Sequence, residues 1–299
     1  MSSAVLFDPT STIGALQIGV LVSVLLFGIT TSQAYVYYSR FPEDSAKLKV
    51  LVAFVWCCEL GHAICIGHGL YTYTISDYGQ PERLFGPMPK SVVLAVFFTG
   101  VIEPCVQTFF SFRIYGLSKK LCIPVLSWIL SFVRLAENMV GVAAALGMKS
   151  MQGYLAQWEW LITADWCISV TNDVVITVTL VSLLHLQRTN AHKRTALLMD
   201  KLIAWTIETG MLTSVMSILT LALFLREKES FIWVSVYFVA PRLFSNSLLA
   251  SLNSRTTLRA MNDVPLSSLN LTAIGMPSNS VQIRWTKVQG VTRDEEESV

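Results

Sequence analysis

Charged side chains are scarce in this chain. Asp, Glu, Lys and Arg make up 14% of its 299 residues, whereas an ordinary soluble domain carries about 25%. A soluble fold of this length needs more charge to cover its surface, so the composition excludes a soluble enzyme and a disordered protein. The formal net charge of +2 gives no basic field for DNA or RNA, so we expect no nucleic-acid partner.

The motifs of several well-known chemistries are also missing. The chain has no Gly-x-x-x-x-Gly-Lys-Ser/Thr phosphate loop, no His-Glu-x-x-His zinc helix and no Gly-x-Ser-x-Gly nucleophile elbow. Its last apolar segment has no Lys for a retinal Schiff base. The six cysteines lie in or beside apolar segments, which indicates no disulfide framework. We predict a protein that is not an enzyme and holds neither a cofactor nor a metal.

Apolar residues, in contrast, make up 53% of the chain and gather in long runs. A spanning helix needs about 20 of them, and seven stretches qualify. They are Ile13–Tyr37, Leu48–Ile75, Val92–Tyr115, Ile123–Gly147, Trp160–Leu184, Leu202–Leu225 and Phe231–Leu252. We therefore predict an all-α membrane bundle of seven transmembrane helices within residues 13–255. Residues 1–12 form a short N-terminal segment, and the polar residues 256–299 form a disordered tail.

The basic residues are divided unequally between the two ends of these spans. Fifteen of the 22 fall in the first, third and fifth connections and the tail, whereas five fall on the opposite side. Cytoplasmic loops carry the excess of Lys and Arg, so we predict a cytoplasmic C-terminus and an outer N-terminus. The sequon Asn270-Leu271-Thr272 then lies in the cytoplasm, and we expect no glycan on it. The membrane is either the plasma membrane or an endomembrane.

Ionisable side chains inside the predicted spans are the best candidates for function, because such groups are expensive in lipid and face the bundle interior. On helical spacing, Arg242, Asn246 and Asn253 share one stripe, and Arg134 has Glu137 within ion-pair reach. We expect these polar faces to converge on one interior. The candidate ligand- or ion-binding residues are Glu59, Glu103, Gln107, Asp173, Arg242 and Asn246. The alternative is that these side chains only fix the helix packing.

Several stretches resemble a known family. The most telling are residues 208–214, read ETGMLTS, and residues 245–255, read SNSLLASLNSR. They are similar to the integral membrane proteins of mushroom-type fungi that carry domain of unknown function 6534. The similarity is strongest over residues 165–255, and residues 14–50 and 106–115 also contribute. The resemblance implies a seven-span fold of fungal origin, and it implies no activity.

Three functions fit the sequence, and the lipid bilayer is a partner in each. We favour a receptor-like or sensory protein with a small-molecule ligand inside and a cytoplasmic partner on residues 185–201 and the tail. The alternatives are a transporter or channel for a proton, cation or small solute, and a non-catalytic structural membrane protein. Against transport, the chain has no internal repeat. Against kinship with G-protein-coupled receptors, Phe112-Arg113-Ile114-Tyr115 replaces their Asp/Glu-Arg-Tyr triplet.

Overall fold

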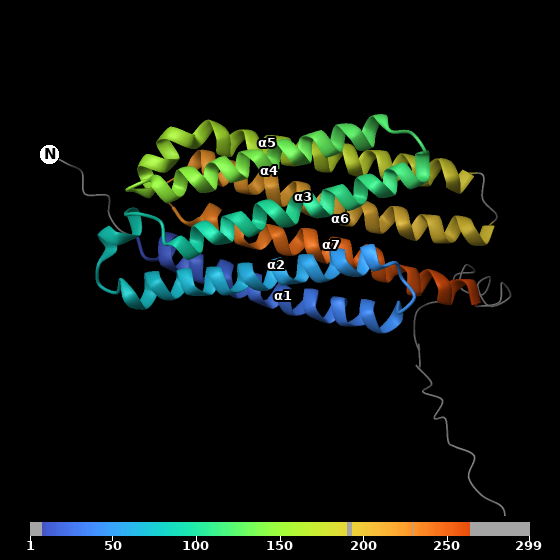
Figure 1. Cartoon of the computed structure of the whole chain (residues 1–299), viewed down its shortest axis with the longest axis horizontal. Helices are drawn as coiled ribbons and strands as arrows, with labels where there is room; N and C mark the ends of the chain where they lie inside the picture. The colour runs from blue at the N-terminus through green and yellow to red at the C-terminus, as the bar shows by residue number, and fades with distance from the viewer. Residues whose placement is uncertain (1–7, 190–192, 229, 264–299) are drawn as a thin grey trace, which may run out of the picture. The chain divides into compact units, whose positions relative to one another are not determined.

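Seven long helices form the chain in a computed structural model that describes residues 8–189, 193–228 and 230–263. They are α1 (Ala15–Arg40), α2 (Ala46–Tyr71), α3 (Lys90–Ser118), α4 (Cys122–Gly147), α5 (Met151–Thr189), α6 (Lys193–Arg226) and α7 (Ile232–Asp263). All seven are long and apolar enough to cross a membrane, and the described residues contain no strand. The predicted all-α, seven-span fold is confirmed (Figure 1). The predicted N-terminal segment lies largely outside the described residues, as does the tail from residue 264.

Helix α7 continues past its predicted end at Leu252 to Asp263, so residues 256–263, predicted to belong to the disordered tail, are helical. Helices α5 and α6 begin well before the spans predicted for them. The fifth span was expected to begin at Trp160, but α5 begins at Met151 because Met151 and Leu155 pack into the core at that end. The sixth was expected to begin at Leu202, but α6 already begins at Lys193. An ion pair between Arg188 and Asp200 joins the facing ends of α5 and α6. The polar connection at 185–201 therefore consists largely of two helix ends. Hydropathy marks only the lipid-embedded part of a helix, so it missed these extensions.

Helix α7 lies at the centre of the bundle. Helices α1 to α6 pack against one another in chain order, and α3 also contacts α5. Between the α1–α2 pair and the α4–α5 pair runs α7 (Figure 1). In its most apolar window 78% of the residues are buried, against 22–50% in the other six helices. Side chains of α7 contact α1, α2, α3, α5 and α6. The other six helices therefore form most of the surface that faces lipid.

Contacts at both ends of the bundle fix the connections. At one end Arg255 of α7 pairs with Asp44 at 2.6 Å and lies 4.1 Å from the centroid of the Phe41 ring, both in the first connection. At the other end the backbone N–H of Phe231 donates to the carbonyl of Ser11 at 3.0 Å. Near the same end, the N–H groups of Thr10 and Ser11 donate to the Asp8 carboxylate, which lowers the pKa of Asp8.

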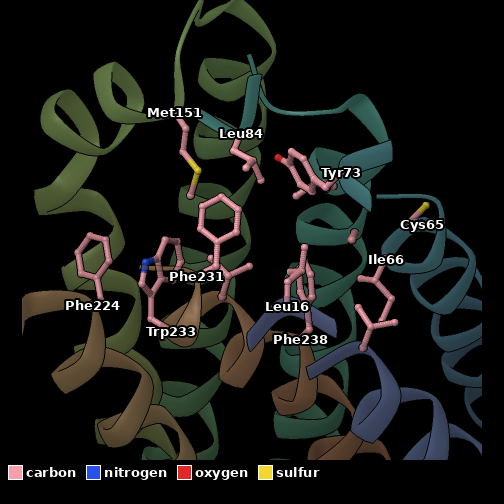
Figure 2. Close-up of a cluster of buried hydrophobic side chains, with 14 of the residues drawn as sticks. Leu16, Cys65, Ile66, Tyr73, Leu84, Met151, Phe224, Phe231, Trp233 and Phe238 are labelled. Atoms are coloured by element: carbon pink, nitrogen blue, oxygen red, sulfur yellow. The ribbon is translucent and has the colours of Figure 1, made fainter. Parts of the chain in front are cut away.

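A large hydrophobic cluster occupies the end of the bundle where α7 begins. Its buried members come from α1, α2, α3, α5, α6 and α7, and from the short helices η2 (Thr72–Ser76) and η3 (Pro81–Phe85). Figure 2 shows Met151, Leu84, Tyr73 and Phe231 pointing toward one another in this cluster. Trp166 packs edge-on against Phe224 and Trp233, with ring centroids 5.1 and 6.0 Å apart. Aromatic pairs of this kind add stability beyond their buried area.

The close approach of α1 and α7 depends on Gly19. A Cβ atom at this position would lie 2.6 Å from the Ser235 Cα atom of α7, so the backbones would have to separate. We expect Gly19→Ala to lower the free energy of unfolding by about 1–3 kcal/mol, the range for overpacked cores. Thermal unfolding of the purified protein in bicelles measures the change.

The matched control for this substitution is Gly28→Ala on the same helix. Nothing lies within 4 Å of a Cβ atom at Gly28, and Ala favours helix over Gly. We expect the melting temperature of this variant to stay the same or to rise. Equal losses in the two variants would contradict the close contact between α1 and α7.

Candidate functional site

Arg242 of α7 is the centre of a buried ionic cluster between α1, α2 and α7. Its guanidinium forms an ion pair with the Glu59 carboxylate and donates to the Glu59 carbonyl at 2.9 Å. It also donates to Ser23 Oγ and to His62 Nδ1, each at 2.9 Å. Because a guanidinium can only donate, His62 accepts through Nδ1 and is the neutral ring with its proton on Nε2. Arg242, Glu59, His62 and Ser23 are all 0% exposed.

Protein groups also contact the Glu59 carboxylate and the face of the guanidinium, whereas His62 Nε2 is buried without a hydrogen-bond partner among the described residues. Ser245 Oγ donates to the remaining Glu59 oxygen at 2.5 Å, and the Phe27 ring covers the guanidinium at 5.1 Å. The charges of Arg242 and Glu59 balance, and neither residue lines a cavity described below. Buried pairs of this kind fix helix positions. We interpret this cluster as a packing element.

The predicted polar stripe of α7 faces α1 along its whole length. Below Arg242, the Asn246 amide donates to the Thr30 hydroxyl at 3.0 Å and to the Leu26 carbonyl at 3.3 Å. About two turns further along α7, the Asn253 amide donates to the Gln33 carbonyl at 2.9 Å. The sequence spacing thus identified the right face, and its neighbour in the structure is another helix.

A second buried cluster joins α3, α4 and α5 around Arg134. One guanidinium nitrogen donates to Glu103 Oε2 at 2.7 Å, and Nε donates to Asp165 Oδ1 at 3.0 Å. Glu137, one turn away on the same helix, lies within ion-pair reach of Arg134 by sequence spacing. The structure instead gives Arg134 the two carboxylates from neighbouring helices, and Glu137 makes no ion pair within 4 Å among the described residues. One positive charge therefore serves two acids.

Polar side chains continue from this cluster along α3. One turn beyond Glu103, the Gln107 amide donates to Asp173 Oδ1 of α5 at 2.8 Å. The Gln107 carbonyl oxygen accepts from Asn172 at 2.9 Å, and Asn172 also reaches Ser131 of α4 at 3.1 Å. Gln107 and Asp173 line a small second cavity of about 30 Å³ together with Thr213 of α6. Two layers of buried polar groups thus lie on consecutive turns of α3.

A first cavity of about 120 Å³ lies above the Arg134 cluster, at the end of the bundle where α7 begins. Its walls are largely apolar, and their aromatic members come from η2, α5, α7 and the residue directly before α7. The aromatic lining residues are Tyr73, Tyr154, Trp166, Phe231, Trp233, Tyr237 and Phe238. Its polar lining includes Glu137, Asn138 and Asp165. A concave, mostly apolar pocket with a few convergent polar groups is the usual form of a small-molecule site.

The floor of this cavity connects it to the buried ion pairs. The Asp165 side chain is 24% exposed, whereas those of Arg134 and Glu103 are 5% and 6% exposed. Asp165 therefore faces both the cavity and the guanidinium. A ligand that contacts Asp165 would act directly on the charges that hold α3, α4 and α5 together.

A third cavity of about 360 Å³ lies at the opposite end, between α3, α6 and α7. Arg113, Trp205, Glu208 and Ser251 are among the side chains that line it. The Arg113 guanidinium donates to Ser251 Oγ at 2.8 Å and so links α3 to α7. By the distribution of basic residues, this end is the predicted cytoplasmic end.

The expectation of one converging polar interior was wrong. Among the described residues, no hydrogen bond or ion pair joins the Arg242 cluster to the Arg134 cluster, because α7 meets α1 and α2 with one face and α3 and α5 with another. None of the six candidates, Glu59, Glu103, Gln107, Asp173, Arg242 and Asn246, lines the first cavity. Gln107 and Asp173 line only the small second one. Nor does any group of three or more described His, Cys, Asp or Glu side chains form a metal site.

Sequence reasoning passed over most of the residues that line the first cavity. Glu137 and Asp165 also lie inside predicted spans but are not among the six candidates. The aromatic residues of α5 and α7 are not among them either, and aromatic residues near span ends are also typical of membrane interfaces. The available signal was their position: Trp166, Trp233 and Tyr237 all fall toward the same predicted end of their spans, and Trp166 directly follows Asp165.

The fold and the buried charges define an integral membrane protein of seven helices. Residues 169–257 match the model of a family of unknown function, DUF6534. The matched segment covers under a third of the chain and contains Asp173, Arg242 and the whole polar stripe of α7. No curated protein matches the chain.

The Arg242–Glu59 pair gives a testable account of the first cluster. We expect Arg242→Met to lower the free energy of unfolding by about 3–5 kcal/mol, because it leaves the Glu59 carboxylate buried without a counter-charge. In the double variant Arg242→Met/Glu59→Met, both charges are gone and we expect most of this stability to return. Equilibrium unfolding in bicelles measures both. A double variant as unstable as the single one would contradict the pairing.

Proposed function

We propose that this protein is a receptor-like or sensory membrane protein that binds a small molecule in the first cavity. The observation that carries the proposal is the position of Asp165, which lines the cavity and pairs with Arg134 beneath it. Arg134 in turn pairs with Glu103 on α3. A ligand bound there changes the electrostatic interactions between α3, α4 and α5. Such a change shifts the equilibrium between conformations of the whole bundle.

The third cavity supports the receptor-like part of this proposal, in which ligand binding at one end of the bundle affects the other end. Helix α3 carries Glu103, which pairs with Arg134 beneath the first cavity, and Arg113, almost three turns further on, which lines the third cavity. A displacement of α3 at one end therefore changes the shape of the other end. On the predicted orientation, this end faces the cytoplasm and is where a partner of residues 185–201 and the tail would bind. The resemblance to fungal membrane proteins agrees with a fungal source.

Ligand binding is tested by thermal stabilisation of the purified protein against a panel of small aromatic compounds. A ligand that binds only the folded state at a concentration of about 100 times its Kd adds about 2.7 kcal/mol to the free energy of unfolding. Ile162 lines the first cavity, and we expect Ile162→Trp to fill it and to abolish this stabilisation.

The control places the same new side chain outside the cavity. Ile218 on α6 is 52% exposed, and we expect Ile218→Trp to bind like the wild type. The proposal fails if no compound stabilises the wild type, or if Ile162→Trp retains the full effect. The receptor-like part of the proposal requires that binding in the first cavity changes the third cavity. We therefore expect a bound compound to change the rate at which maleimide labels Glu208→Cys in the third cavity.

Proton transport is the second candidate, and the two polar layers on α3 are the observation that favours it. Asp165 lies at the first cavity and Asp173 at the second, with Glu103 and Gln107 between them on α3. Against transport, Arg134 lies across this route and holds both Glu103 and Asp165.

Flux measurements separate the two candidates. In proteoliposomes with a pH gradient, a proton pathway predicts a flux that Asp173→Asn reduces at least tenfold. The receptor-like proposal predicts no flux above that of empty vesicles in either protein. A flux that Asp173→Asn abolishes would overturn the receptor-like proposal.

A further inference from the structure

The walls and floor of the first cavity carry an excess of negative charge. Glu137 and Asp165 line it, and no Lys or Arg is among its described lining residues. Beneath the floor, Arg134 is shared by Asp165 and Glu103. With all four groups ionised, three carboxylates share one guanidinium. The Arg242–Glu59 cluster is balanced by comparison.

Glu137 is the acid at this cavity that makes no ion pair among the described residues; Asp173, at the second cavity, makes none either, but its Oδ1 atom accepts from Gln107. The Oε2 atom of Glu137 is buried and has no hydrogen-bond partner among the described residues, and the same holds for Oδ1 of the neighbouring Asn138. Asn138 is held in place because its amide nitrogen donates to the Val96 carbonyl at 3.2 Å. Two oxygen acceptors on adjacent residues of α4 therefore border the cavity without donors. A buried carboxylate in this state favours a cation or a hydrogen-bond donor.

The aromatic walls suit the same kind of ligand. The faces of aromatic rings attract organic cations, and aromatic residues recur in sites for ammonium ligands. Trp166, Trp233 and Tyr237 form one connected aromatic group, with Trp166 6.0 and 6.4 Å from the other two ring centroids. The volume of about 120 Å³ is close to that of cavities that take up a benzene ring.

We infer that the first cavity binds a small organic monocation, an alkyl- or arylammonium compound, with Glu137 as its counter-charge. The ammonium group donates to Glu137 and Asn138, and the apolar body lies against Trp166, Trp233 and Tyr237. Asp165 remains with Arg134. The inference rests on the proposed function, because it names the class of ligand for the same cavity.

Three probes of similar size and different charge test the inference. They are 2-phenylethylammonium, the neutral 2-phenylethanol and the anion 3-phenylpropanoate, each titrated against the purified protein by calorimetry in nanodiscs. We expect the wild type to bind the ammonium compound at least tenfold more tightly than the alcohol, and the anion more weakly than either. Glu137→Gln should bring the ratio of ammonium to alcohol close to one, while Glu137→Asp, which keeps the charge, should preserve a preference for the cation.

Glu208→Gln is the matched control, because it removes an acid that lines the third cavity instead. We expect it to keep the wild-type ratio. Equal binding of ammonium and alcohol by the wild type, tighter binding of the anion, or an unchanged ratio in Glu137→Gln would overturn the inference. If the alcohol still binds and Ile162→Trp abolishes that binding, the proposed function stands while the inference on charge fails. If none of the three probes binds, the inference is overturned, and the wider panel of aromatic compounds decides the proposed function separately.

Discussion

The guanidinium of Arg242 lies near the middle of the apolar part of α7 with none of its surface exposed. A charge at this depth requires a counter-charge and hydrogen-bond acceptors from the protein itself, because lipid offers neither. Helix α2 supplies Glu59 and His62, and α1 supplies Ser23. These contacts hold only if the three helices keep one register and one rotation. The small residue Gly19 then lets α1 approach α7 closely enough for the contacts to form.

The two buried clusters differ in how completely their charges are balanced. Around Arg242, one base meets one acid and the remaining donors and acceptors are provided by neutral groups. Around Arg134, one base meets two acids, and a third acid borders an adjoining cavity. A cluster with balanced charges stabilises one arrangement of its helices. A cluster with excess negative charge can still bind a cation or a hydrogen-bond donor. The chemistry of this protein is therefore expected on the α3–α4–α5 side, and its rigidity on the α1–α2–α7 side.

The sequence was sufficient for the class and number of helices, because 20-residue apolar runs have few alternatives. Helical spacing also grouped Arg242 with Asn246, and Glu103 with Gln107, since residues on one face need only a regular helix. It could not say which helix each face meets. The spacing put Glu137 within ion-pair reach of Arg134 on the same helix, whereas the structure pairs Arg134 with Glu103 and Asp165 on two others. Which face meets which neighbour depends on the rotation and the order of the helices in the bundle. The residue pattern of a single sequence does not reveal either of these.

The central position of α7 also bears on how the chain enters the membrane. Helices that face lipid can be released into the bilayer one at a time, but a segment with a mid-span Arg partitions poorly by itself. Its acceptors are on α1 and α2, the first helices to be synthesised, while α7 is the last. Glu59 and His62 therefore remain without their Arg242 partner until α7 has been translated. A chain that stops before residue 242 leaves an acid in α2 without its counter-charge, a defect that membrane quality control can recognise.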